Sequence, residues 1–309
     1  MRVLAITGPT GSGKSALAMA LAPKLNAEIV CMDSMQIYRR MDIGTAKPTK
    51  QERAAVPHHM LDLVEPTGAY AVADYADAAE KVILEILGRG RTPMLVGGTG
   101  LYLQALMRGL GLGGVGSDEA LRDRLRSIAQ QEGGRERLHA RLAQVDPQRA
   151  ASLNPNDVRR VIRALEVFEL TGAPMSQQPP QAVERAFKVL PLTLDMPREI
   201  LFDRIARRVS RMLDDGLVEE VASLLESGVP AQAQAMQGIG YKEIIPVVQG
   251  RETIKNAAWN VEIHTRHYAK RQMTWLRAQP ETIWLKATQA DLTCQALEAA
   301  RRFLEGGQA

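Results

Sequence analysis

Short apolar runs alternate with segments of helical periodicity through most of the chain. Such runs, when glycine or polar residues bound them, are typical of buried strands. The predicted strands cover 3–6, 29–32, 94–96, 189–194 and 282–285. The predicted helices cover about 14–25, 70–87, 197–214, 217–226, 251–277 and a last segment to about 304. This alternation predicts an α/β fold, in which helices flank a parallel sheet.

The alternation is interrupted in the middle of the chain. Glycines crowd the segment 109–116, which is typical of a linker or hinge. From 117 to 172 the pattern is helical, and Leu121, Leu125 and Ile128 follow i, i+4, i+7 spacing. The segment QQPPQ at 177–181 ends this block. We therefore predict an all-helical insertion domain of residues 111–181 within a core of residues 1–110 and 182–309, the second part of which includes the C-terminal helices.

The residues after the first predicted strand match the phosphate-binding pattern G-x-x-x-x-G-K-[ST] at every position: Gly8, Pro9, Thr10, Gly11, Ser12, Gly13, Lys14 and Ser15. The match follows a strand and opens a helix, which is the context that the pattern requires. Its glycines let backbone N–H groups converge on phosphate oxygens, and the helix N-terminus adds a partial positive charge. Lys14 supplies a cation, and the Ser15 hydroxyl is suited to Mg²⁺. The chain is thus predicted to hold a polyphosphate in a P-loop NTPase-like sheet, with ATP as the default ligand.

Polar residues follow other predicted strands. Asp33 and Asp195 each end an apolar run, where P-loop proteins often carry a metal-holding aspartate. Asp33 is the better placed, but a carboxylate there also suits a general base, and the pattern leaves both roles open. Thr99 follows a third strand within a glycine-rich turn, at the edge where open α/β sheets bind ligands. Thr99 is therefore a candidate hydrogen-bonding residue, although a tight turn alone explains the glycines.

Basic residues are concentrated in a few segments. Arginines at 204, 208 and 211 share one face of a predicted helix. A solvated basic face is the ordinary explanation, and a face toward diphosphate or RNA is the alternative. The segment 264–277 holds four cationic residues and no acid, interleaved with Tyr268 and Trp275. This combination is typical of an RNA-backbone contact with stacking, or of a core helix that buries both aromatic rings.

Composition narrows the class of protein further. The chain has 309 residues and a formal net charge of +4, which is too small to indicate nucleic-acid binding by itself. Its 2 cysteines lie far apart and form neither a zinc cluster nor a disulfide framework, so a reducing compartment fits. No signal peptide or membrane-spanning run is present in the sequence, and we expect a cytoplasmic protein without membrane contact.

Several motifs, in order, extend over nearly the whole chain and together resemble the family of bacterial tRNA dimethylallyltransferases, also called tRNA isopentenyltransferases. They are GPTGSGKS at 8–15, DSMQIYRRMDIGTAKP at 33–48, GGTGLYL at 97–103, NDVRRVIRALEV at 156–167, GIGYKE at 238–243 and TRHYAKRQMTWLR at 265–277. The second motif is far more specific than the P-loop. Arg40 is a departure, because many relatives have glycine there.

The resemblance implies transfer of the dimethylallyl group from dimethylallyl diphosphate to N6 of adenine at position 37 of tRNAs that read codons beginning with U. Diphosphate is then released. In this interpretation the P-loop holds the diphosphate of the donor, Asp33 is the base, and Thr99 lies near the reacting groups. Lys14, Mg²⁺ at Ser15 and an arginine of the 204–211 helix, for which we favour Arg208, stabilise the leaving group.

The resemblance also implies that the target adenine flips into the site and that the helical insertion holds the anticodon stem. We expect a monomer. The implied contacts to the tRNA anticodon stem-loop come from Asp33, Ser34, Met35, Gln36, Thr99, Asp157, Val158, Arg159, Arg160, Val161, Gly238, Ile239, Gly240, Tyr241, Lys242, Glu243, Arg266, Lys270 and Arg271.

Two other functions use the same features. A P-loop kinase of a small metabolite needs an acceptor pocket and a mobile arginine-rich lid, for which 111–181 is a candidate. A nucleotide-switched RNA-binding protein is the other alternative. A guanine-reading signature such as N-K-x-D would support it, and the sequence contains none.

Overall fold

The computed structural model describes residues 1–108, 115–178 and 185–306. Six parallel strands form one sheet in the order β3-β2-β4-β1-β5-β6. Their bounds are β1 Arg2–Thr7, β2 Ala27–Cys31, β3 His58–His59, β4 Thr92–Val96, β5 Lys188–Asp195 and β6 Ile283–Lys286. The five predicted strands are confirmed. The apolar runs of β1, β2, β4 and β5 are buried, whereas the edge strand β6 buries Leu285 and leaves Trp284 exposed. Only the two-residue edge strand β3 was not predicted.

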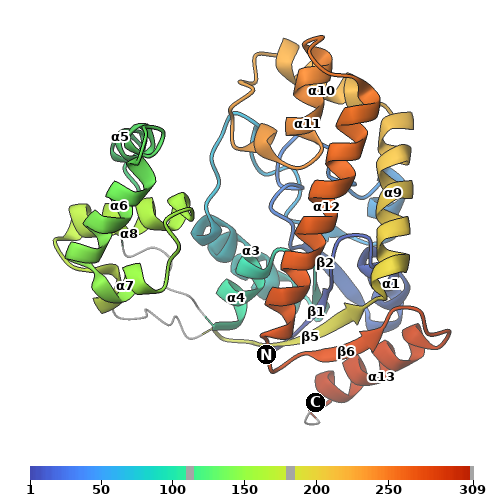
Figure 1. Ribbon diagram of the computed structural model, residues 1–309. Coiled ribbons are helices and arrows are strands. Elements are labelled where there is room, and N and C mark those ends of the chain that lie inside the picture. The colour runs from blue at the N-terminus through green and yellow to red at the C-terminus, as the bar shows by residue number, and fades with distance from the viewer. Residues whose placement is uncertain (109–114, 179–184, 307–309) are drawn as a thin grey trace. The chain divides into compact units, whose positions relative to one another are not determined.

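Helices cover both faces of the sheet (Figure 1). α1 (Lys14–Leu21) and α13 (Leu292–Leu304) pack against each other and against β1. α3 (Val72–Gly88) packs against α4 (Gly100–Arg108) and contacts β2 and β4. The prediction of a P-loop-like parallel sheet with flanking helices is confirmed.

A second group of helices packs beside the sheet, around a separate cluster of buried side chains that includes Tyr38, Met41 and Tyr241. Its helices are α9 (Arg198–Asp214), α10 (Leu217–Glu226), α11 (Tyr241–Val248) and α12 (Ile254–Arg277). α12 contacts α9, α11 and α4. The chain from 33 to 64, which includes α2 (Lys50–Ala55), lies against this group and brings the second motif to the edge of the sheet.

Residues Gly109–Val183 form a compact unit separate from Met1–Arg108 and Glu184–Ala309. Its described helices are α5 (Glu119–Ala129), α6 (Gly134–Val145), α7 (Pro147–Ala151) and α8 (Val158–Thr171). They bury their own apolar cluster, which includes Leu121 and Leu125. Both predicted boundaries of the insertion, at 110/111 and 181/182, lie outside the described residues, as does most of the glycine-rich linker.

In the part of the chain that the structure describes, no helix is long and apolar enough to cross a membrane.

Candidate active site

Three loops meet at the carboxyl edge of the sheet, because β1, β2 and β4 are neighbours and parallel. The P-loop, Gly8–Ser15, follows β1, Asp33 follows β2, and Thr99 follows β4. This is the edge at which open α/β sheets bind ligands. The topology thus brings the predicted phosphate loop and both predicted polar residues to one place.

The P-loop has the backbone conformation that its glycines permit. Gly8, Gly11 and Gly13 have φ values of 147°, 82° and 93°, where side chains are strained. A Cβ atom on Gly8 would lie 2.8 Å from the Ser12 hydroxyl oxygen. That hydroxyl is buried and has no hydrogen-bond partner among the described residues. The loop therefore offers a narrow concavity with a free polar atom, which suits phosphate oxygens.

Lys14 and Ser15 open α1 at the end of this loop. The pKa of Lys14 is lowered to about 8, chiefly by burial and also by the Arg208 charge, while the Asp33 charge opposes both. Lys14 is thus a cation whose charge is poorly solvated, so an anion beside it is strongly favoured.

Asp33 and Thr99 each accept a hydrogen bond from a backbone amide of the loop after β2. The Met35 amide donates to Asp33 Oδ1 at 2.9 Å, and the Ser34 amide donates to Thr99 Oγ1 at 3.2 Å. The two loops approach closely, because a Cβ on Gly97 would lie 1.9 Å from the Met32 carbonyl oxygen. Close packing rather than a turn alone therefore requires this glycine.

A pocket of about 100 Å³ lies between the P-loop and Asp33 and is not lined by Thr99. Its polar walls include Lys14, Ser15, Asp33, Gln36 and Arg208, and its apolar walls include Met19, Cys31 and Val96. Asp195 does not line this pocket, but a groove between α9 and α12. Of the two candidate aspartates, the structure places Asp33 beside Lys14.

The arginines of α9 surround the entrance to the P-loop. Arg208 donates to Thr10 Oγ1 at 3.4 Å and to the Thr45 carbonyl oxygen at 3.5 Å, so it joins the P-loop to the second motif. Burial lowers the pKa of its guanidinium. A hollow of about 930 Å³ is lined by Lys14, Ser15 and the arginines at 204, 207, 208 and 211. The basic helix face is therefore directed at the phosphate site, although the role of Arg208 stays a prediction.

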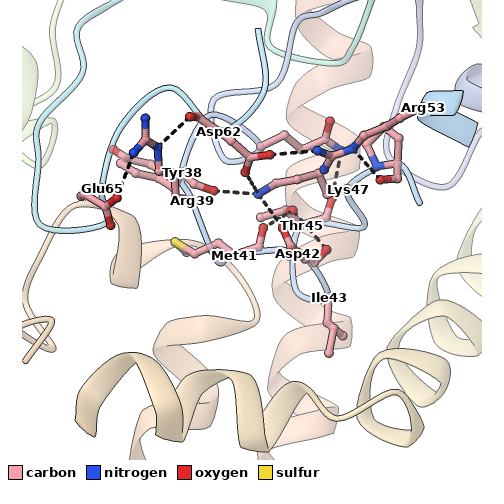
Figure 2. Close-up of polar contacts among 12 residues, drawn as sticks. Tyr38, Arg39, Met41, Asp42, Ile43, Thr45, Lys47, Arg53, Asp62 and Glu65 are labelled. Carbon is pink, nitrogen blue, oxygen red and sulfur yellow. Dashed lines mark hydrogen bonds and ion pairs between the residues drawn. The ribbon is translucent and has the colours of Figure 1, made fainter. Parts of the chain in front are cut away.

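The second motif is held by a buried lysine that the sequence did not reveal as such (Figure 2). The Lys47 side chain is 0% exposed, and its ammonium group contacts Asp42 Oδ1 at 2.6 Å and Asp62 Oδ1 at 2.7 Å. It also donates to the Tyr38 carbonyl oxygen at 2.7 Å. Arg53 binds the other oxygen of Asp62 at 2.9 Å. One ammonium group thus ties together three points of the loop, and so fixes the backbone beyond Asp33.

A carboxylate from α10 holds the same loop from the other side. Glu220 accepts hydrogen bonds from three consecutive amides, those of Asp42, Ile43 and Gly44, at 2.9, 2.8 and 3.1 Å. The Tyr241 hydroxyl donates to Glu220 at 2.6 Å. A Cβ on Gly44 would lie 2.6 Å from the Tyr241 ring. Gly44 is therefore needed at this position, because a larger residue would clash with the Tyr241 ring.

Arg40 lies at a turn whose backbone favours glycine. Its φ is 62°, in the left-handed region. Its guanidinium donates to Ser227 Oγ at 3.0 Å and contacts Glu65 at 3.1 Å. These contacts offset part of the backbone strain, so Arg40 occupies the turn in place of glycine.

The GIGYKE segment lies against the second motif, since a Cβ on Gly238 would lie 2.3 Å from the Met35 side chain. Tyr241 is 0% exposed, and Glu243 is buried beneath His264, whose Nδ1 lies 2.6 Å from Glu243 Oε1. Tyr241 and Glu243 therefore support the loop from within. RNA contact from this segment, including Ile239, Gly240 and Lys242, stays a prediction.

α12 presents its two sides to different surroundings. Tyr268, Gln272 and Trp275 lie toward the P-loop and the Gly97–Gly100 turn. Arg266 and Lys270 line the groove between α9 and α12, where Arg266 lies over the Phe202 ring at 4.9 Å. Arg271 lies over Tyr268 at 5.7 Å. The cations of the segment 264–277 therefore do not share one surface: Arg266 and Lys270 line the groove, and Arg271 lies over Tyr268.

In the insertion, the segment 157–161 begins α8. Arg159 and Arg160 are exposed, and Arg160 pairs with Asp157 at 3.2 Å. Val161 is buried in the apolar cluster of this unit, with Val158 packed against it. Arg159 and Arg160 are therefore the residues of this segment that are open to a partner, and their contact with RNA stays a prediction.

The fold and site define a P-loop protein in which a carboxylate lies beside the phosphate loop. A family model described as IPP transferase matches residues 36–279, and the chain belongs to this family. It is 46% identical to the tRNA dimethylallyltransferase of Trichlorobacter lovleyi, over 96% of this chain and 98% of that protein. It is 47% identical to the tRNA dimethylallyltransferase of Pelotomaculum thermopropionicum, over 97% and 95%.

Solved structures agree. The tRNA isopentenylpyrophosphate transferase of Bacillus halodurans matches with a TM-score of 0.71 and 39% identity, over 99% of this chain and 96% of that chain. A eukaryotic dimethylallyltransferase acting on tRNA matches with a TM-score of 0.82 and 29% identity, over 99% and 80%.

Proposed function

We propose that this protein transfers the dimethylallyl group of dimethylallyl diphosphate to N6 of adenine at position 37 of tRNAs that read codons beginning with U. One observation carries the chemistry: Asp33 and Lys14 line the same small pocket, and its remaining walls are partly apolar. A carboxylate base, a lysine that can bind diphosphate and an apolar wall for a short hydrocarbon thus lie together. The near full-length similarity to tRNA dimethylallyltransferases supports the same reaction.

The reaction requires one proton to be taken up and one diphosphate to be released. The exocyclic amine of adenine is a weak nucleophile, because its lone pair is delocalised into the ring. As the bond from N6 to C1 of the donor forms, Asp33 accepts the N6 proton, and the bond from C1 to the diphosphate oxygen breaks. Lys14, the P-loop amides and Arg208 stabilise the charge on the leaving diphosphate. Thr99, fixed by Ser34, lies beside Asp33 and orients the reacting amine.

Mg²⁺ is proposed as the cofactor, with Ser15 as its protein ligand. Ser15 is exposed at the first turn of α1 and lines the same pocket as Lys14 and Asp33. The Ser12 hydroxyl of the P-loop has no hydrogen-bond partner among the described residues. No group of three or more His, Cys, Asp or Glu side chains in the described ranges forms a metal cage. The residues therefore fit an ion that is held mainly by diphosphate and water, as in other P-loop sites. When bound, the ion neutralises part of the charge on the diphosphate.

The proposed partner is the tRNA anticodon stem-loop, bound by a monomer in the cytoplasm. Ser34, Met35 and Gln36 lie between Asp33 and the anchored loop, where they can meet a flipped base and its neighbours. The exposed Arg159 and Arg160 of the insertion and the cations of α12 supply phosphate contacts. Neither a metabolite kinase nor a nucleotide switch finds support in the similar proteins.

The test is a product assay. The protein is incubated with unmodified tRNA, dimethylallyl diphosphate and Mg²⁺, and the digested nucleosides are analysed by mass spectrometry. We expect prenylated adenosine, and no product together with ATP turnover would refute the proposal. Asp33→Ala should lower transfer by at least about 100-fold while tRNA affinity stays within about threefold. Asp77→Ala, an exposed change on α3, is the matched control and should stay active.

A further inference from the structure

One buried amide lies between the two halves of the active site. Gln272 of α12 is 7% exposed and stands between Tyr268 and Trp275 at i, i+4, i+7 spacing. These three side chains form the face of α12 that covers the P-loop and the turn after β4. Gln272 is the polar group at the centre of this face.

Both ends of the Gln272 carboxamide are hydrogen-bonded. Its Oε1 accepts from the Thr10 amide at 2.8 Å, and its Nε2 donates to the Gly98 carbonyl oxygen at 2.8 Å. The two partners fix the orientation of the amide, because an N–H group needs an acceptor and a carbonyl needs a donor. One side chain thus joins the P-loop to the turn that carries Thr99.

The glycines of that turn make room for α12. A Cβ on Gly98 would lie 2.1 Å from Gln272 Nε2, and a Cβ on Gly100 would lie 2.5 Å from the Trp275 ring. The GGTG turn is therefore shaped to receive these two side chains. Its neighbour Thr99 is in turn hydrogen-bonded to the backbone next to Asp33.

We propose that Gln272 is a positioning residue, which sets the separation between the phosphate cradle and the Asp33–Thr99 pair. This inference rests on the proposed prenyl transfer, in which the P-loop holds the donor and Asp33 and Thr99 meet the adenine. Gln272 acts through Thr10 and Gly98, and it holds C1 of the donor in line with N6. A small loss of alignment in such a transfer lowers the rate strongly while both substrates still bind.

Two variants test the proposal. Gln272→Met keeps the length of the side chain but removes both hydrogen bonds. Gln272→Glu keeps an acceptor for Thr10 and places a second oxygen against the Gly98 carbonyl. We expect kcat to fall about 30- to 100-fold in Gln272→Met and further in Gln272→Glu. The KM for dimethylallyl diphosphate and the Kd for tRNA should stay within about threefold.

Gln279→Met is the matched control. Gln279 is also buried and also joins two segments, through Arg108 at 3.4 Å and the Trp275 carbonyl at 3.3 Å, but away from the site. Its kcat should stay within about threefold of the wild type. Circular dichroism and thermal unfolding establish that each variant is folded, and if Gln272→Met does not fold, Gln272→Glu decides.

The outcomes separate the two proposals. A wild-type enzyme that makes no prenylated adenosine refutes the proposed function itself. An active wild type with Gln272 variants that keep kcat, or that lose only substrate affinity, overturns the positioning role alone. A selective loss of kcat that Gln279→Met does not share supports it.

Discussion

Replacing Lys47 by methionine removes the ammonium group from the centre of the network in Figure 2 and keeps most of the volume of the side chain. Removing one partner of a buried ion pair typically costs about 3–5 kcal/mol. Here the cost is at the lower end, because Asp42 is 61% exposed and returns to water, and Asp62 keeps Arg53. The Tyr38 carbonyl, in contrast, is left without its hydrogen-bond donor. We expect the free energy of unfolding to fall by about 3 kcal/mol.

Urea and thermal unfolding measure this loss. All 3 tryptophans belong to the unit that contains Lys47, so their fluorescence reports on its unfolding: Trp259, Trp275 and Trp284. A loss of about 3 kcal/mol lowers Tm by roughly 6–9 °C in a unit of this size. Lys50→Met removes an exposed lysine three positions away and should change stability by less than about 0.5 kcal/mol. If Lys47→Met is as stable as Lys50→Met, the reasoning about the buried network is wrong.

Three further results are expected. Because burial lowers the pKa of Lys14 to about 8, the KM for dimethylallyl diphosphate should rise as the pH passes above 8, and Lys14→Met should lose this dependence in steady-state kinetics. A hydrogen bond from Arg89 lowers the pKa of Glu28 from 4.5 to about 2, so its stabilising contribution is present above 4.5 and is lost as the pH falls through 2. Acid titration should therefore destabilise Glu28→Gln less steeply than the wild type across this window. Gly44→Ala places a methyl group 2.6 Å from the Tyr241 ring and should lower the free energy of unfolding by about 2 kcal/mol, as measured in urea.

Each of these variants has a control on the same unit. Lys24→Met and Glu85→Gln change exposed residues of matching type, and both should follow the pH dependence of the wild type. Gly88→Ala introduces a methyl group with no atom within 4 Å, and should not destabilise the protein. Equal effects in a variant and its control would contradict the corresponding prediction.

The strands and the P-loop were predictable because their signals are local. A continuous apolar run is buried wherever a parallel sheet has helices on both faces, and the glycine pattern of residues 8–15 specifies its own backbone. The meeting of Asp33 and Thr99 also followed from the sequence, since both end parallel strands. Helix α11 was not predicted, because Pro246 lies inside it and Gly240 precedes it, and both are typical of loops.

The contacts that hold the site together could not be predicted in the same way. Gln272 binds Thr10 across 262 positions of the chain, and Glu220 binds Gly44 across 176. Such contacts leave no periodicity in the sequence. The only local signal for Gln272 was its position between two aromatic residues on one helical face. For Lys47, nothing in the local pattern distinguishes a buried ammonium group from an exposed one.

The carboxylate of Glu220 has a consequence for inhibition by anions. Three consecutive amides converging on one point form an anion site of the same kind as a P-loop. In the loop at Asp42–Gly44 the protein supplies the anion itself, whereas none of the P-loop amide hydrogen bonds within the described residues ends on a carboxylate. We therefore expect free phosphate and diphosphate to compete with the proposed prenyl donor at the P-loop, and we expect neither to bind the loop at 42–44, where Glu220 already occupies the amides. On this reasoning only the P-loop is left open to an added anion, and we expect one diphosphate to bind per active site.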